Sequence, residues 1–206
     1  MTITTLLCFL GASAALTLAP GPDNLFVLSQ GILRGRKPAI VTALGMCSGI
    51  SIHTTAAAFG ISAVFYSSVL AFNTVKLAGA AYLLYLAWKT IRSRSTISLD
   101  SADQRNLTAL FRRGFIMNVL NPKVALFFLA FLPQFVTADG GPVPLQMLLL
   151  GVIFMIQATL IFSLIGYFAG GIGRQILSRP RVARYFDLLT AGIFASLGIR
   201  LALAER

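Results

Sequence analysis

Four polar side chains that can bind or transfer charge stand inside apolar runs of this sequence: Asp23, His53, Lys123 and Gln157. A carboxylate can hold an ammonium group, a lysine can hold a carboxylate, and an imidazole exchanges protons near neutral pH. Asp23 and Lys123 together match the two charges of a zwitterion such as an α-amino acid. One histidine and two scattered cysteines give no metal-ligand spacing, so the sequence predicts no metal and no cofactor.

Both charged residues lie where an apolar stretch is interrupted. The first break reads Ala19-Pro-Gly-Pro-Asp-Asn24, and the second reads Asn118-Val-Leu-Asn-Pro-Lys123. Proline cannot continue a helix, but it suits the first position of a new one, and asparagine is a good N-cap. We therefore predict that a second half-helix begins at each break, with free N–H groups that could hold a carboxylate.

The breaks define the predicted site. Inside a membrane, irregular backbone is tolerated only where protein or a watery cavity covers it, so both breaks should face the interior. The predicted substrate-binding residues are Pro20, Gly21, Pro22, Asp23, Asn24, Asn118, Asn121, Pro122, Lys123 and Gln157. Asp23 and His53 are the predicted proton carriers.

Each of these residues also has a simpler interpretation. The prolines could only bend helices for packing, and Asp23 and Lys123 could form a structural ion pair. A lysine in the first turn of a half-helix is disfavoured by the helix dipole and needs some other partner. His53 could be satisfied by a neighbouring backbone carbonyl.

The composition indicates the class of elements that position these residues. Of the 206 residues, 57% are hydrophobic and 11% charged, with a mean hydropathy of +0.83. A soluble domain carries about a quarter charged residues, so this chain predicts an all-α integral membrane protein. Six stretches are long enough to cross a bilayer; they cover residues 4–31, 39–65, 69–89, 112–136, 145–172 and 185–204. The basic residues that give the net charge of +11 cluster between these spans, a membrane pattern that argues against a nucleic-acid partner.

The basic residues predict the orientation. Thirteen of the 17 Lys and Arg residues follow spans 1, 3 and 5, and the other two connections contain none. Because basic connections stay in the cytoplasm, both termini should lie outside it.

The chain divides into two halves of three spans. We predict a single transmembrane domain over 1–206, with one repeat at about 1–92, a cytoplasmic connection at about 93–110 and a second repeat at about 111–206. Three spans per half invert the second repeat, and the broken spans 1 and 4 then correspond, as in many secondary transporters. Glycines four apart, at Gly45 and Gly49 and again at Gly166 and Gly170, predict close helix packing in spans 2 and 5.

Three segments resemble the LysE/RhtB family of amino-acid exporters: Pro20 to Asn24, Lys76 to Leu86, and Asn118 to Val136. The resemblance extends over essentially the whole chain and implies efflux of amino acids from the bacterial cytoplasm across the inner membrane, coupled to proton entry. It points to Asp23, Asn24, Asn121, Pro122 and Lys123 as site residues, and more closely to the branch that handles neutral amino acids such as homoserine and threonine. Ala87 departs from the pattern, which would place glycine there.

We therefore expect an exporter with alternating access, whose partners are an amino acid, protons and membrane lipids; a homodimer is left open. One alternative is a membrane enzyme acting on lipid headgroups through Asp23 and His53, although neither a nucleophile nor a metal set is visible. The other is a membrane assembly subunit without transport activity, which would not need two charged breaks.

Overall fold

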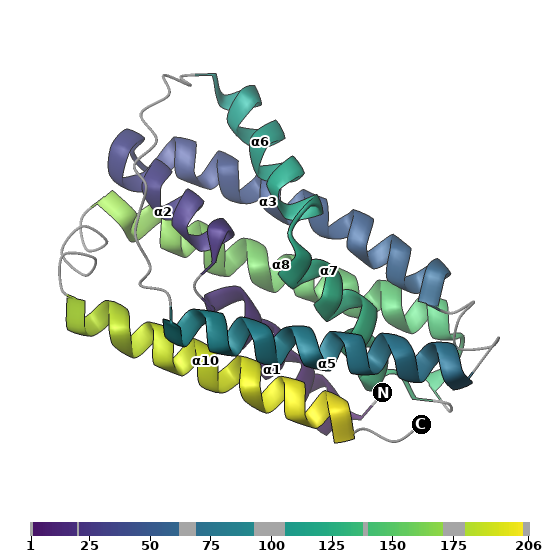
Figure 1. Cartoon of the computed structure of the whole chain (residues 1–206). Helices are drawn as coiled ribbons and strands as arrows, with labels where there is room; N and C mark the ends of the chain where they lie inside the picture. Colours follow the sequence, from purple (N-terminus) through teal and green to yellow (C-terminus); the bar gives the residue numbers. More distant parts are fainter. Residues whose placement is uncertain are drawn as a thin grey trace.

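The computed structural model describes residues 2–19, 21–61, 69–92, 106–137, 140–170 and 180–203. These residues form helices without any strand (Figure 1), as predicted for an all-α protein. The first broken span consists of α1 (Ile3–Leu18) and α2 (Pro22–Arg34), and the second of α6 (Leu107–Val119) and α7 (Pro122–Leu126). The unbroken helices are α3 (Arg36–Thr55), α5 (Val69–Arg92), α8 (Val143–Phe168) and α10 (Pro180–Leu203).

Some of these helices continue as π-helix or 3₁₀-helix beyond their α-helical residues. A π-helical segment, η1 (Ala56–Ile61), extends α3, and α7 passes into the π-helical η2 (Phe127–Phe131) and the 3₁₀ segment η3 (Leu132–Phe135). The half-helix predicted after the second break is therefore only five residues of α-helix. Residues 132–135 contain Pro133, which cannot supply an N–H group to a regular helix.

Both predicted breaks are present. The first broken span bends by 57° between Ile3–Leu18 and Asp23–Arg34, and the second bends by 47° between Leu107–Val119 and Pro122–Phe135. Among the described residues, Arg36–Gly60 and Val143–Phe168 are long and apolar enough to cross a membrane, and the two bent pairs bring the total to as many as four. At 1.5 Å per residue, the 24-residue α5 and α10 are each about 36 Å long.

Local sequence explains where the helices start and stop. Asn106 caps α6 by accepting hydrogen bonds from the backbone N–H groups of Thr108 and Ala109. Gly35 separates α2 from α3 with a φ of +88°, a conformation that glycine adopts without steric cost. The sharp turn there folds α2 back onto α3 (Figure 1).

Small residues let the helix backbones approach closely. α3 packs on α6, where a Cβ added at Gly114 would lie 2.6 Å from the Thr42 carbonyl oxygen, and one added at Gly45 would meet the Phe111 backbone. Gly166 lies against Ala39 in the same way. The close packing predicted at Gly45 and Gly166 is confirmed. α5 and α10 run side by side along the molecule (Figure 1).

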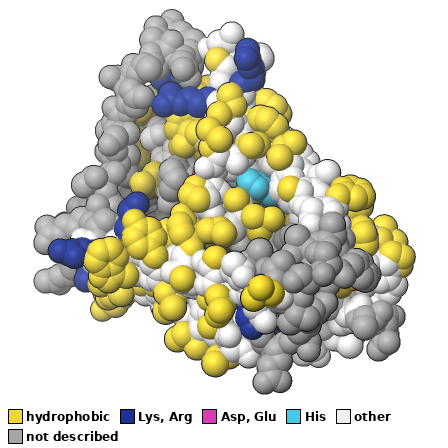
Figure 2. Space-filling view, turned by 45° about the vertical axis from the view of Figure 1, so that its right-hand side comes forward, with side chains coloured by type: hydrophobic (Ala, Val, Ile, Leu, Met, Phe, Trp, Pro, Cys, Tyr) yellow, Lys and Arg dark blue, Asp and Glu magenta, His cyan; other side chains and the backbone are white. Residues whose placement is uncertain are grey.

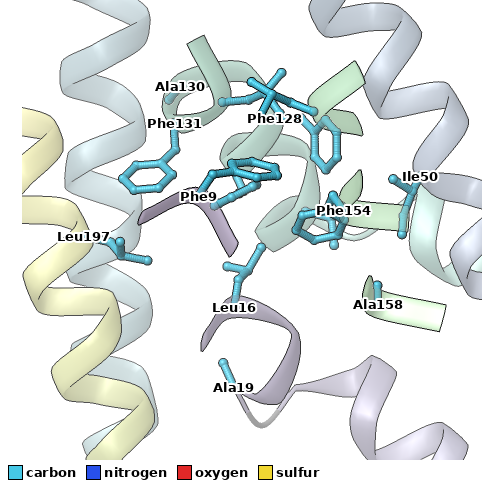
Figure 3. Packing of buried hydrophobic residues seen from close by; sticks show 14 of the residues in the cluster. Phe9, Leu16, Ala19, Ile50, Phe128, Ala130, Phe131, Phe154, Ala158 and Leu197 are labelled. Carbon is cyan, nitrogen blue, oxygen red and sulfur yellow. The ribbon is translucent and has the colours of Figure 1, made fainter. Parts of the chain in front are cut away.

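An aromatic cluster fills the core at the end where α1 begins. Phe9 of α1 contacts Phe135, with 5.2 Å between ring centroids, and Phe127 contacts Phe154 of α8 at 5.4 Å. The cluster comprises Phe9, Phe127, Phe128, Phe131, Phe135 and Phe154, all buried. Figure 3 shows Phe9, Leu16 and Ala19 following one another along α1, from this cluster towards the break.

The outer surface is mostly apolar. Exposed leucine, isoleucine and valine side chains run along α8, and Figure 2 shows hydrophobic side chains over the middle of one face, with Lys and Arg mainly towards its upper and left margins. Such a surface suits contact with lipid rather than water.

Candidate functional site

The two breaks meet inside the bundle. Asn121 Nδ2 donates a hydrogen bond of 2.6 Å to Asp23 Oδ2, although the two residues are 98 positions apart in the sequence. Asn121 Oδ1 accepts from the backbone N–H of Lys123 at 3.0 Å and so caps α7, as predicted. One asparagine therefore satisfies the start of one half-helix and holds the carboxylate at the start of the other.

Lys123 reaches across to the first break. Its ammonium donates to the carbonyl oxygens of Leu16 and Ala19, both at 3.2 Å. These carbonyls belong to the end of α1, where the helix dipole favours a positive charge. From the sequence we expected Lys123 to need a partner, and that partner is the end of another helix, α1.

Asn24 completes the end of α1. Its Nδ2 donates to the Thr17 carbonyl at 2.8 Å, and Asp23 lies in the first turn of α2, where the dipole favours a negative charge. Asp23 and Lys123 are 1% and 6% exposed. Asp23 bonds to Asn121, and Lys123 bonds to the Leu16 and Ala19 carbonyls, so each of the two charged groups has hydrogen-bond partners apart from the other.

Four buried side-chain atoms in the described part of the chain lack a hydrogen-bond partner, and all four are oxygens. They are Asp23 Oδ1, Asn24 Oδ1, Gln30 Oε1 and Asn118 Oδ1. All four residues belong to the two broken spans. Because a buried acceptor without a donor is costly, such oxygens mark a place where a donor-bearing group could bind.

His53 joins this region from α3. Its Nε2 lies 3.0 Å from the Asn118 carbonyl oxygen, near the end of α6, and its ring is 6.0 Å from that of Phe128. The simpler interpretation, a histidine bonded to a backbone carbonyl, is therefore realised.

Gln157 lies apart from the breaks. Its Nε2 donates to the Leu10 carbonyl at 3.0 Å, and its Oε1 accepts from the Ser13 hydroxyl at 2.6 Å. These bonds attach α8 to α1 about one helical turn before the residues that Lys123 holds. The structure thus brings together all the predicted site residues whose side chains it describes except Gln157.

The comparisons with known proteins identify the family. The sequence model of the LysE type translocators matches residues 14–205, most of the chain.

This chain belongs to the LysE type translocator family.

The relatives of this translocator are bacterial membrane proteins. A membrane protein of Bacillus subtilis is 30% identical over 97% of this chain and 99% of its own length. The homoserine/homoserine lactone efflux protein of Salmonella typhimurium is 29% identical over 100% of this chain and 99% of its own length. A leucine efflux protein of Enterobacter sp. is 29% identical over 91% of this chain and 90% of its own length. No solved structure matches.

Membership makes this translocator a transport protein, and the membrane-enzyme alternative is excluded on that ground. Of the motif residues behind the resemblance, Pro20 and the side chain of Pro22 lie outside the described residues. At Gly21, an added Cβ would lie 3.2 Å from Lys123 Nζ, so glycine leaves room for the ammonium. Ala87, the departure from the family pattern, is buried within α5.

The sequence did not predict every functional group of this translocator. The carbonyls of Leu16, Thr17 and Ala19 carry no side-chain signal, and only the fold shows that Lys123 and Asn24 reach them. Gln30 was also missed, although its spacing of seven residues from Asp23 was readable as two turns of one helix face.

Proposed function

We propose that this translocator exports amino acids from the cytoplasm and binds them where the two broken spans meet. The observation that carries the proposal is the buried, unpartnered oxygen of Asp23, in a carboxyl group that Asn121 holds where the two breaks meet. Asp23 Oδ1 and Asn118 Oδ1 would accept from the substrate ammonium. The efflux of homoserine and leucine named for the relatives supports the choice of substrate.

The carboxylate would bind at Lys123. An ammonium group has three donors, and the carbonyls of Leu16 and Ala19 take two of them. The remaining donor would hold the carboxylate, so the site would recognise both ends of an amino acid.

The proposed coupling is proton antiport. Protonation of Asp23 would weaken its hold on an ammonium group, so proton entry and substrate release would be linked. His53 would carry the proton to or from this region, since its ring lies beside Asn118 at the second break. An inward proton gradient should therefore accelerate export, and removal of the gradient should slow it.

The proposed architecture is six spans in two inverted repeats that alternate access to the site. Several contacts support it, because they are those that a twofold exchange of the halves requires. At the level of whole spans, α3 of span 2 packs on α6 of span 4 as α8 of span 5 packs on α1 and α2 of span 1. In the same way, α5 of span 3 contacts η2 of span 4, and α10 of span 6 contacts α1 of span 1. The exchange swaps α3 with α8 and α5 with α10, so the α3–α8 and α5–α10 contacts are each mapped onto themselves.

Counterflow of radiolabelled homoserine and leucine into liposomes tests the proposal. Wild-type protein should accumulate at least one of them, and Asp23→Asn should reduce the rate by about ten- to a hundredfold, the value of a hydrogen bond to a charged group. The Asn side chain keeps the size of Asp and can still meet Asn121, so the variant should remain folded. Wild-type liposomes that accumulate neither compound would refute export of these amino acids, and full activity of Asp23→Asn would refute the role of that carboxylate.

A further inference from the structure

Gln30 is a buried polar residue to which the proposed mechanism assigns no role. It lies in α2, is 3% exposed, and its Oε1 has no hydrogen-bond partner. The neighbouring Ser29 is similarly buried, but its hydroxyl donates to the Phe26 carbonyl at 2.8 Å within the same helix. Of these two adjacent polar residues, only Gln30 has a side-chain oxygen that takes part in no hydrogen bond.

Gln30 lies on the same face of α2 as Asp23. Seven residues make nearly two full turns, so the two side chains are about 20° apart around the axis and about 10–11 Å apart along it. Gln30 is the nearer of the two to Arg34, at the end of α2 that we propose is cytoplasmic.

The neighbours of α2 show where this face points. On one side, Val27 lies against Gly166 of α8, and on the other, Arg113 of α6 lies over the Phe26 ring at 4.9 Å. Asp23 and Gln30 fall between these two sides, towards α3, the helix that α2 contacts most extensively. The stripe therefore faces the interior of the bundle and not lipid.

The two ends of the site differ in chemistry. Towards the start of α1 the breaks are covered by the apolar Phe9 cluster (Figure 3), which offers no acceptor side chain. Towards Arg34, the unpartnered buried side-chain oxygen of α2 that follows those of the adjacent Asp23 and Asn24 is that of Gln30. Among the described residues, a group that donates hydrogen bonds thus meets unpartnered acceptors in succession on the Arg34 side of the break.

We propose that Gln30 is a second binding position for the substrate ammonium, between the Arg34 end of α2 and Asp23. This inference rests on the proposed amino-acid export. The neutral amide oxygen holds an ammonium more weakly than the Asp23 carboxylate does, so the substrate passes on to the break and is not trapped on the way.

The experiment compares full-length wild type, Gln30→Met, Gln30→Glu and the matched control Ser29→Ala in liposomes. Methionine keeps the length of glutamine and removes its acceptor. We expect Gln30→Met to lower the initial rate of homoserine or leucine counterflow about tenfold, the effect of losing one hydrogen bond to a charged group. Equilibrium binding to the detergent-purified protein should change less than twofold, and Ser29→Ala should match wild type in both assays.

Gln30→Glu provides a second test that does not depend on how well Gln30→Met folds. In Gln30→Glu, the concentration of leucinamide that half-inhibits counterflow should be about tenfold lower than in wild type, because a carboxylate holds an ammonium more strongly. Inhibition by N-acetyl-leucine, which lacks an ammonium, should be the same in the variant and in wild type. Unchanged leucinamide inhibition, or Gln30→Met counterflow equal to wild type, would overturn the inference. Equal losses in Gln30→Met and Ser29→Ala would also overturn it by indicating a packing role. Wild type inactive towards both amino acids would instead refute the proposed export.

Discussion

Hydrogen bonding at the breaks is asymmetric between donors and acceptors. The amide of Asn24 and the ammonium of Lys123 donate to backbone carbonyls at the end of α1, and the amide of Asn121 donates to the Asp23 carboxylate. The unpartnered atoms in the described part of the chain are all acceptors. Donors are therefore used to hold the two broken spans together, and acceptors remain to bind a solute that carries N–H groups.

Lys123 has a structural and a binding role that one pair of measurements can separate. Lys123→Met should destabilise the protein by roughly 2 kcal/mol, because the Leu16 and Ala19 carbonyls lose their donor while the cost of burying a charge is removed. Thermal unfolding in detergent would measure this loss. If Lys123 also binds the substrate carboxylate, the variant should lose the preference for leucine over leucinamide in counterflow inhibition. A preference equal to that of wild type would show that Lys123 only joins the breaks.

Glycine decides how closely the helices approach. α6 can bring Asn118 to the break and to His53 only because its backbone lies against α3 at Gly45, Gly49 and Gly114. A Cβ at Gly49 would lie 2.9 Å from Asn118 Oδ1 itself. The α3–α6 contact thus positions part of the site as well as the core.

Gly114→Ala should separate these helices. Its methyl group would lie 2.6 Å from the Thr42 carbonyl, which is backbone and cannot swing away, so we expect a loss of about 1–3 kcal/mol in stability. Gly192→Ala is the matched control in α10, since an added Cβ there has nothing within 4 Å. Melting temperatures of the two purified variants would check the expectation. Equal temperatures would mean that the α3–α6 contact yields without cost.

At the scale of the whole molecule, the helix ends fall into two groups at opposite ends of the bundle. The connection at Gly35, the end of α8 at Phe168 and the start of α10 at Pro180 lie at one end in Figure 1. The start of α1, the start of α8 and the end of α10 lie at the other. This arrangement agrees with the alternation of basic connections along the sequence.

Cysteine labelling would test the proposed orientation. In a background with Cys8→Ser and Cys47→Ser, a cysteine replacing the exposed Gly140 should react with a membrane-impermeant maleimide in intact cells. A cysteine replacing the exposed Lys37 should react only after permeabilisation, because basic connections stay in the cytoplasm. The reverse pattern would place both termini inside.

The sequence by itself determined the membrane class, the positions of both breaks and the cap at Asn121, because hydropathy, proline and asparagine act through local backbone chemistry. It also placed Asp23 and Lys123 at those breaks. Only the tertiary structure decided that Lys123 binds the end of α1, that Gln157 joins Ser13 and Leu10 instead of the breaks, and that Gln30 Oε1 has no donor. These contacts join residues up to 147 positions apart, and their partners are mostly backbone carbonyls. A carbonyl is common to every residue, so its availability depends on where a helix ends and what packs against it.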